Sequence, residues 1–278
     1  MNVQTVLDEI AGQATAGELV FSTHTAVALR VQKLLDDPDC AIERLSTLIS
    51  ADPLLAARSL AVANSAAYNP GGRTITELKA AIARLGFSTL RGLTASIIVR
   101  QLAGDSLSAE QAALSARLWE HTAHVAALSR VIARKITRQN PEAAFLAGIL
   151  HEIGGFYLIG QSTRHPGLFD DDLELWHEEG EARIGGAILH ALDVPESLAD
   201  ALATVWTGFL SLPPRSLGDT VLLADELAPV ESPLDALTGM SRRGINTEIE
   251  LLVDEQTLSA ILAESAAEVG SLANALKH

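Results

Sequence analysis

The sequence has little of several features that would define a class of protein. Its 278 residues include one cysteine, Cys40, so an intramolecular disulfide is excluded, and no Cys-x-x-Cys pair offers a zinc site. The start, MNVQTVLDEI, lacks a basic leader and an apolar secretion segment. The most apolar runs, 93–99 and 143–150, are shorter than the ~20 residues that cross a bilayer. We therefore expect a cytoplasmic protein with no membrane partner.

Charge is distributed unevenly along the chain, and this is more informative than the net charge of −15. Residues 58–138 carry eleven Lys or Arg against four Asp or Glu, whereas residues 139–278 carry six against twenty-three. A basic segment beside acidic ones is one pattern of nucleic-acid binding. Here the basic residues are spread singly along expected helices, and aromatic residues for base stacking make up only 4% of the chain. We expect the basic helices to pair with the chain's own acidic surface, and no nucleic-acid partner.

Apolar residues recur with helical spacing in nearly every long segment, and the alternating Val/Ile/Thr-rich runs typical of strands are scarce. Asp52-Pro53 is typical of a helix start, and residues 74–77 have the sequence of a capping box. The sequence therefore predicts an all-α protein, with further helices near residues 25–35, 41–50, 109–138, 142–160, 180–191, 196–208, 217–228 and 255–276.

The punctuation of the chain predicts its division into parts. Gly104-Asp105 separates an N-terminal helical lobe, residues 1–104, from a second helical lobe, residues 105–228. A looser stretch from Pro229 to Asn246 begins a C-terminal part, residues 229–278, that ends in helix. We find no internal repeat, and nothing in the sequence indicates an oligomeric state.

Four polar residues of the second lobe have the chemistry of a metal site that handles phosphate. His121 precedes the pair His151-Glu152 by thirty residues, and Asp225 follows it by more than seventy. Imidazole and carboxylate groups are the ligands that such a site needs. Each residue also has a simpler interpretation, because buried imidazole and carboxylate groups can satisfy one another by hydrogen bonds.

Several motifs in one order resemble the HDOD family, the HD-related output domains of bacterial signalling proteins. They are Asp52-Pro53-Leu54-Leu55, the run 63–68 (ANSAAY), the run 80–86 (AAIARLG), Leu118-Trp119-Glu120-His121, and the run 144–154 (AFLAGILHEIG). The resemblance covers roughly residues 18–228. It implies two packed helical lobes, the second related to HD-domain phosphohydrolases, followed here by a C-terminal helical tail. It also implies a role in signal transduction, usually without demonstrated catalysis.

The resemblance assigns metal-ligand positions to His121, His151 and Asp225. Glu152 stands where HD-domain enzymes carry a bridging Asp, and its extra methylene moves the carboxylate by about 1.5 Å, more than the ~0.2 Å tolerance of a metal–ligand distance. Members with more metal carry two further histidines, and an approximate alignment puts Glu181 and Trp206 at those positions.

An indole nitrogen only donates, so Trp206 cannot be a ligand. We therefore expect no cofactor, or at most one divalent metal ion. Three states of the site stay open: a satisfied polar network, one bound ion, or working catalysis.

Asn64 and Ser65, within the ANSAAY run, are a second pair of interest. They are expected either to line a ligand or partner pocket or simply to end a helix and begin a turn. Together the features favour a regulatory module that binds a signalling protein or a small signalling ligand. The alternative is a metal-dependent phosphohydrolase acting on a nucleotide or cyclic dinucleotide.

Overall fold

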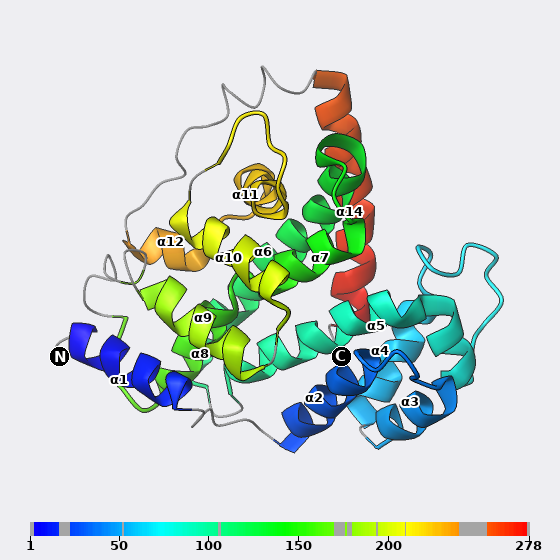
Figure 1. Cartoon of the computed structure of the whole chain (residues 1–278), viewed down its shortest axis with the longest axis horizontal. Coiled ribbons are helices and arrows are strands. Elements are labelled where there is room, and N and C mark those ends of the chain that lie inside the picture. Colours follow the sequence, from blue (N-terminus) through cyan, green and yellow to red (C-terminus); the bar gives the residue numbers. More distant parts are fainter. Residues whose placement is uncertain are drawn as a thin grey trace.

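A computed structural model shows a chain of packed helices, and the residues that it describes contain no strand (Figure 1). The prediction of an all-α protein is therefore confirmed. The helix cap predicted at Asp52 lies outside the described residues, which are 3–16, 23–51, 53–104, 107–169, 176, 180–192, 194–208, 210–238 and 255–276.

The N-terminal lobe is formed by three helices that pack on the first part of a long fourth helix. These are α2 (Thr23–Leu35), α3 (Ile42–Ile49), α4 (Pro53–Asn64) and α5 (Leu78–Leu102). Leu45 and Ile49, four residues apart on one face of α3, are both fully buried. Burial of each such side chain stabilises the fold by about 1.5–3 kcal/mol. The rest of this core includes Val31, Leu55, Ile82 and Leu90.

Helix α5 connects the two lobes. Its first part belongs to the N-terminal core, whereas Ala95, Val99 and Leu102 belong to the core of the second lobe. Gly86 has φ 72°, a left-handed conformation that favours glycine, and it kinks the helix there. Because the helical part after Gly86 places Leu90 in the first core and Val99 in the second, the lobes share a rigid element rather than a loose linker.

The capping box predicted at residues 74–77 does not form. Helix α5 begins at Leu78, and Glu77 occupies the cap position without a side-chain hydrogen bond. The reason lies in Asn64, whose side chain bonds both backbone groups of Ile75: Oδ1 accepts from the Ile75 amide at 2.7 Å, and Nδ2 donates to the Ile75 carbonyl at 2.8 Å. These bonds hold the residues before Leu78 in an extended conformation.

The second lobe packs around the long helix α6 (Ala109–Ile132), which continues as the short π-helix η1 (Ala133–Thr137). Ser108 begins α6 with a capping box, and Asn140 caps the next helix ahead of a proline. The remaining helices of the lobe are α7 (Pro141–Leu150), α8 (Ile153–Gln161), α9 (Glu181–Ala191), α10 (Glu196–Thr207) and α11 (Leu217–Leu227).

One helix predicted over residues 142–160 is two helices, with a turn at His151 and Glu152 between α7 and α8. This break turns the chain at the two polar residues of the expected site. The apolar residues on both sides of it, such as Leu150 and Ile153, are buried, so hydrophobicity alone gave no sign of the break.

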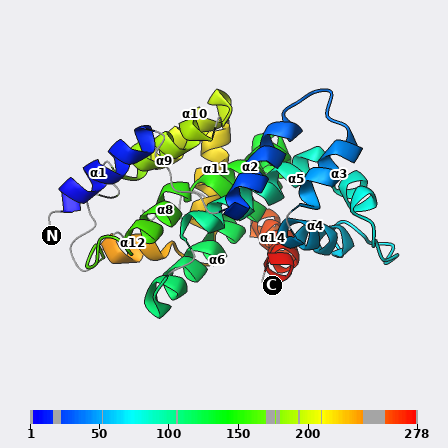
Figure 2. The same cartoon turned by 90° about the horizontal axis from the view of Figure 1, so that it is seen from below.

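The two ends of the chain pack on distant parts of the molecule. Helix α1 (Val3–Thr15) lies against α9, and its Val6, Leu7 and Ile10 enter the core of the second lobe, although the sequence grouped residues 1–104 with the first (Figures 1 and 2). Apolar side chains go where a matching core accepts them, and helical periodicity does not specify which core. At the other end, α14 (Glu255–Leu276) packs on both α6 and α4, while α12 (Pro233–Thr238) contacts α6.

Two segments are long and apolar enough to cross a membrane by composition: Leu78–Leu102 and Pro141–Gln161. In the structure, 61% and 83% of their most apolar windows are buried inside the protein. The second segment is also interrupted by the turn at residues 151–152. Both segments therefore serve as core helices of this fold.

Candidate functional site

Four side chains from four places in the second lobe meet at one point, where His121, His151 and Glu152 are buried and Asp225 is partly exposed. His121 comes from the middle of α6, His151 from the end of α7, Glu152 from the start of α8, and Asp225 from α11. His121 Nε2 lies 3.1 Å from His151 Nε2, 3.3 Å from Asp225 Oδ1 and 3.8 Å from Glu152 Oε1. The predicted convergence of these residues is therefore confirmed, although up to 104 positions separate them in the sequence.

The outer nitrogens of both imidazoles are held by backbone carbonyls. His121 Nδ1 lies 2.9 Å from the Val230 carbonyl oxygen, and His151 Nδ1 lies 2.7 Å from that of Gly148. Because a carbonyl only accepts, each Nδ1 must carry the proton. In a neutral ring Nε2 then holds a lone pair, so two lone pairs face each other across 3.1 Å.

That arrangement needs a positive charge between or beside the rings. A cation between the rings would accept both lone pairs, and the carboxyl oxygens of Asp225 and Glu152 lie 3.3 and 3.8 Å from His121 Nε2. The ligand atoms of His121, His151 and Glu152 all lie within 4.8 Å of one another. Two imidazole nitrogens bound to one divalent ion at ~2.1 Å would stand roughly 3–3.4 Å apart. The three residues thus fit a single divalent ion, which would supply charge neutralisation at this point.

Burial sets the protonation of the central pair. Desolvation, with the nearby His121, lowers the pKa of His151 to about 3, so this imidazole is neutral at physiological pH. Desolvation also raises the pKa of Glu152 well above its usual value, and the neighbouring carboxylates of Glu181 and Asp235 raise it further. The Ser232 hydroxyl, which donates to Glu152 Oε1 at 2.7 Å, opposes that rise. The site concentrates carboxyl groups that repel one another unless protons or a cation neutralise them.

The positions aligned with the auxiliary histidines of the family also lie at the site. The indole Nε1 of Trp206 donates to the backbone carbonyl of His151 at 2.9 Å, and its ring fills the space beside Gly185, where an added Cβ would come within 2.6 Å of the ring. Glu181, at the start of α9, is close enough to Glu152 to raise its pKa. Neither side chain offers an imidazole nitrogen to a metal ion.

A short segment after α11, at residues 230–234, contacts the site, and sequence reasoning did not predict this contact. Val230 bonds His121, and Ser232 bonds Glu152. Leu234 is fully buried and lies where a side chain on Gly155 would have to stand, 2.6 Å from the added Cβ. The run Ser-Pro-Leu-Asp at 232–235 has the pattern of a short helix start. This pattern predicts the start of a helix but does not predict the hydrogen bond from Ser232 to Glu152, 80 positions away.

The family of the chain is decided by comparison with known sequences. The HDOD domain family matches residues 22–207, about two thirds of the chain. This chain belongs to the HDOD family. The resemblance stated from its motifs is thereby confirmed.

Solved structures share the fold of this HDOD protein over almost its whole length. A suspected metal-dependent phosphohydrolase from Shewanella amazonensis is 21% identical, with a TM-score of 0.70 over 97% of this chain and 99% of that one. An HDOD domain protein of unknown function from Geobacter sulfurreducens is 22% identical, with a TM-score of 0.60 over 98% and 94%. At such identity the likeness shows the fold alone. No curated protein sequence matches the chain.

The second pair of expected site residues divides into two roles. Asn64 bonds both backbone groups of Ile75 and the Leu60 carbonyl, so it ties a loop to α4. Ser65 does line a cavity between the lobes, together with Tyr68 and Arg130. Only the structure distinguishes the roles of Asn64 and Ser65, because both belong to one sequence motif.

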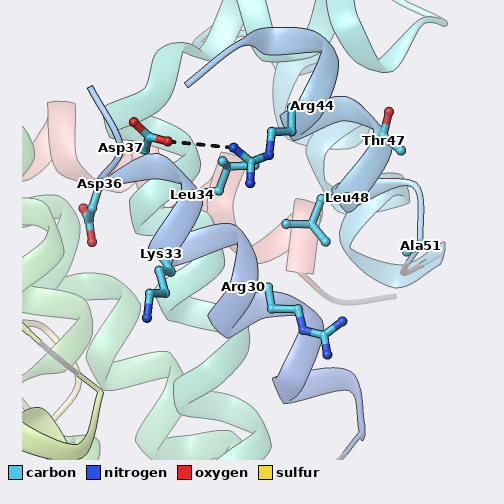
Figure 3. A pocket seen from close by; sticks show the side chains of 9 residues that line it. All are labelled: Arg30, Lys33, Leu34, Asp36, Asp37, Arg44, Thr47, Leu48 and Ala51. Atoms are coloured by element: carbon cyan, nitrogen blue, oxygen red, sulfur yellow. Dashed lines mark ion pairs between the residues drawn. The ribbon is translucent and has the colours of Figure 1, made fainter. Parts of the chain in front are cut away.

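A large groove of about 1,100 Å³ lies on the N-terminal lobe, away from the histidines (Figure 3). Arg30, Lys33 and Arg44 line it, and so do Asp36 and Asp37; Arg44 points toward Asp37, 3.9 Å away. Elsewhere, basic residues of the middle segment face acidic ones: Lys79 pairs with Glu43, Arg91 with Asp36, and Arg130 with Glu142. This mixing of signs supports the expectation that the basic residues do not form one open surface.

Proposed function

We propose that this HDOD protein is a regulatory module that holds and transmits a conformational state without hydrolysing phosphate esters. The observation that carries the proposal is the burial of both histidines inside the chain itself. The Val230 carbonyl bonds the outer nitrogen of His121, the Ser232 hydroxyl bonds Glu152, and both histidines are at most 3% exposed. A phosphate ester would reach neither imidazole unless the surrounding chain moved.

The donor set also argues against hydrolysis. Catalysis of this kind uses a bound metal to lower the pKa of water and, in two-metal sites, a second ion to stabilise the leaving oxygen. Glu152, Glu181 and Trp206 stand where the family's metal-rich members have Asp and His. Loss of the second ion's ligands leaves attacking and leaving oxygens without joint stabilisation.

The same closure suits a regulatory role. The polar centre joins α6, α7, α8 and α11 to the segment at residues 230–234, so a change in its charge alters contacts of five parts of the fold. A protein partner or small ligand that prefers the open or the closed arrangement shifts the population of the two states by its difference in affinity. The polar centre, formed by His121, His151, Glu152 and Asp225, then holds the closed state until a ligand or partner favours the open one.

The alternative function is metal-dependent hydrolysis of a nucleotide or cyclic dinucleotide. It is favoured by one observation, the fit of His121, His151 and Glu152 to a single divalent ion. The same ion is also compatible with the regulatory function, in which it would have a structural role.

Hydrolysis assays separate the two functions. Purified protein would be incubated with a generic phosphodiester, mononucleotides and cyclic dinucleotides in the presence of Mn²⁺, Mg²⁺ or Fe²⁺. We expect no turnover, either for the native chain or for Glu152→Asp, because that substitution restores neither auxiliary ligand. Turnover above ~1 s⁻¹ that His151→Ala abolishes would show the protein to be an enzyme.

A further inference from the structure

A small cavity of about 200 Å³ lies between the two lobes, apart from the histidine site. Val62, Ser65 and Tyr68 reach it from the N-terminal lobe, while Arg130, Arg134 and Phe145 reach it from the second lobe. Any ligand bound there would contact both lobes. Typical ligand pockets measure roughly 300–1,000 Å³, so this cavity suits a small chemical group rather than a whole nucleotide.

The cavity presents two guanidinium groups. Arg130 and Arg134 are one turn apart on α6 and η1, so they share a face. The side chain of Arg130 is only 9% exposed; its guanidinium stacks 4.0 Å over the Phe145 ring and bonds Glu142 and the Tyr68 hydroxyl. These contacts fix the guanidinium in one orientation before any ligand arrives, which reduces the entropy cost of binding.

The cavity also holds a buried hydroxyl whose hydrogen bond is missing. Ser65 Oγ is inaccessible to solvent and has no hydrogen-bond partner among the described residues. Leaving a buried polar group unsatisfied costs about 1–3 kcal/mol. A ligand oxygen in the cavity would satisfy it once the Ser65 hydroxyl turned toward the cavity.

We propose that this cavity binds the phosphate group of a small phosphate monoester, with Arg130 and Arg134 as the charged donors and Ser65 and Tyr68 as hydroxyl donors. Guanidinium groups match the oxygen spacing of phosphate and bind it by paired hydrogen bonds. The inference deepens the proposed regulatory function, on which it rests, by naming the ligand class and its site.

The position of Arg134 shows how binding is transmitted. Arg134 and Lys135 both pair with the carboxylate of Glu264 on α14, the Lys135 Nζ at 2.7 Å. Helix α14 packs on α6 and on α4, so it spans the boundary between the lobes (Figure 2). Phosphate in the cavity competes with Glu264 for Arg134. Binding therefore weakens the ion pairs between η1 and α14, and removal of the Glu264 charge strengthens phosphate binding.

The test is a titration of metal-free protein with inorganic phosphate at constant ionic strength, followed by calorimetry. We expect saturable binding to the native chain, weakened about tenfold or more by Arg134→Gln, since a hydrogen bond to a charged group contributes at least that much. Glu264→Gln is expected to tighten binding several-fold. Arg117→Gln, an exposed arginine on the same helix but away from the cavity, is the matched control and leaves affinity unchanged.

Hydrogen exchange of α14 is the second readout, and phosphate should accelerate it in the native chain but not in Arg134→Gln. The proposal is overturned if phosphate does not bind, if it binds Arg134→Gln as well as native protein, or if Glu264→Gln has no effect. O-phosphoserine, compared with inorganic phosphate, distinguishes a phosphorylated side chain from a free ion as the source. If phosphate does not bind and no hydrolysis is seen, only the phosphate site is rejected and the regulatory function stands. If the earlier assays show turnover, the regulatory function is rejected, whatever binds in the cavity.

Discussion

The Nε2 atoms of His121 and His151 face each other at 3.1 Å while both Nδ1 atoms are bonded to backbone carbonyls. This geometry fixes where the ring protons lie and leaves a position that only a proton or a cation can fill. It is therefore the feature of the site from which metal binding is best predicted.

We predict that divalent metal binds at one ion per chain at most. Titration of chelator-treated protein with Mn²⁺ or Zn²⁺, measured by calorimetry and elemental analysis, checks the stoichiometry. His151→Ala removes one of two nitrogens and is expected to abolish this binding, whereas His190→Ala, an exposed histidine at the end of α9, leaves it intact. Two ions per chain would contradict this prediction.

We predict that Glu152→Gln stabilises the metal-free protein at neutral pH. Desolvation and the neighbouring Glu181 and Asp235 raise the folded-state pKa of Glu152 above its unfolded value of about 4.5. Above that pH the unfolded chain releases a proton that the folded chain retains, so the native protein loses stability as pH rises. Glutamine does not titrate, and its carbonyl oxygen can still accept from Ser232.

The expected gain is on the order of 1 kcal/mol, or about 2–4 °C in Tm for a chain of this size. Thermal unfolding in the presence of chelator from pH 4 to pH 8 measures it. The difference between variant and native protein should grow above pH 4.5 and vanish below it. A constant difference across this range would indicate a packing effect instead of a charge effect.

Periodicity predicted the helices because helix formation follows the local spacing of apolar residues. The order of the family motifs predicted the four converging residues. The turn at His151 and Glu152 was not predicted, since Leu150 and Ile153 are buried on both sides and the apolar run continues through it. The contact of Val230 with the site could not be predicted from the sequence either. Its contact with His121 uses a backbone carbonyl 109 positions away, and a carbonyl has no signature in a sequence.

The capping box at residues 74–77 failed for a related reason. Thr74 and Glu77 have the right identities and spacing, but Asn64 bonds the backbone of Ile75 and holds the segment extended. A tertiary contact thus overrode a local preference. The assignment of α1 to the first lobe differed from the structure likewise, because its apolar face fits the core beside α9.

We predict that Gly148→Ala is strongly destabilising while Gly186→Ala is not. A Cβ on Gly148 would stand 2.5 Å from the Cα of Ala126, so α6 and α7 would have to separate, at a cost of about 1–3 kcal/mol or more. Gly186, in α9, has no atom within 4 Å of an added Cβ, and alanine there should stabilise the helix by roughly 0.5–1 kcal/mol. Urea unfolding of both variants gives the comparison, and equal midpoints would contradict the close helix contact.

The last prediction concerns the segment that closes the histidine site. Ser232→Ala removes the hydroxyl that donates to Glu152 Oε1 at 2.7 Å, in a place where both side chains are buried. Loss of this bond leaves the carboxyl group without one of its donors, at a cost of about 1–3 kcal/mol. Because the bond joins the segment to α8, the cost falls on closure of the site. Amide hydrogen exchange over residues 228–238 should therefore accelerate, with the core of α6 unchanged. Thr163→Ala, which removes an exposed hydroxyl bonded only to the nearby Gly160 carbonyl, should leave exchange in the segment as it is. If Ser232→Ala also leaves amide exchange in the segment unchanged, the segment is held by its apolar contacts alone. The polar centre then does not hold the closed state.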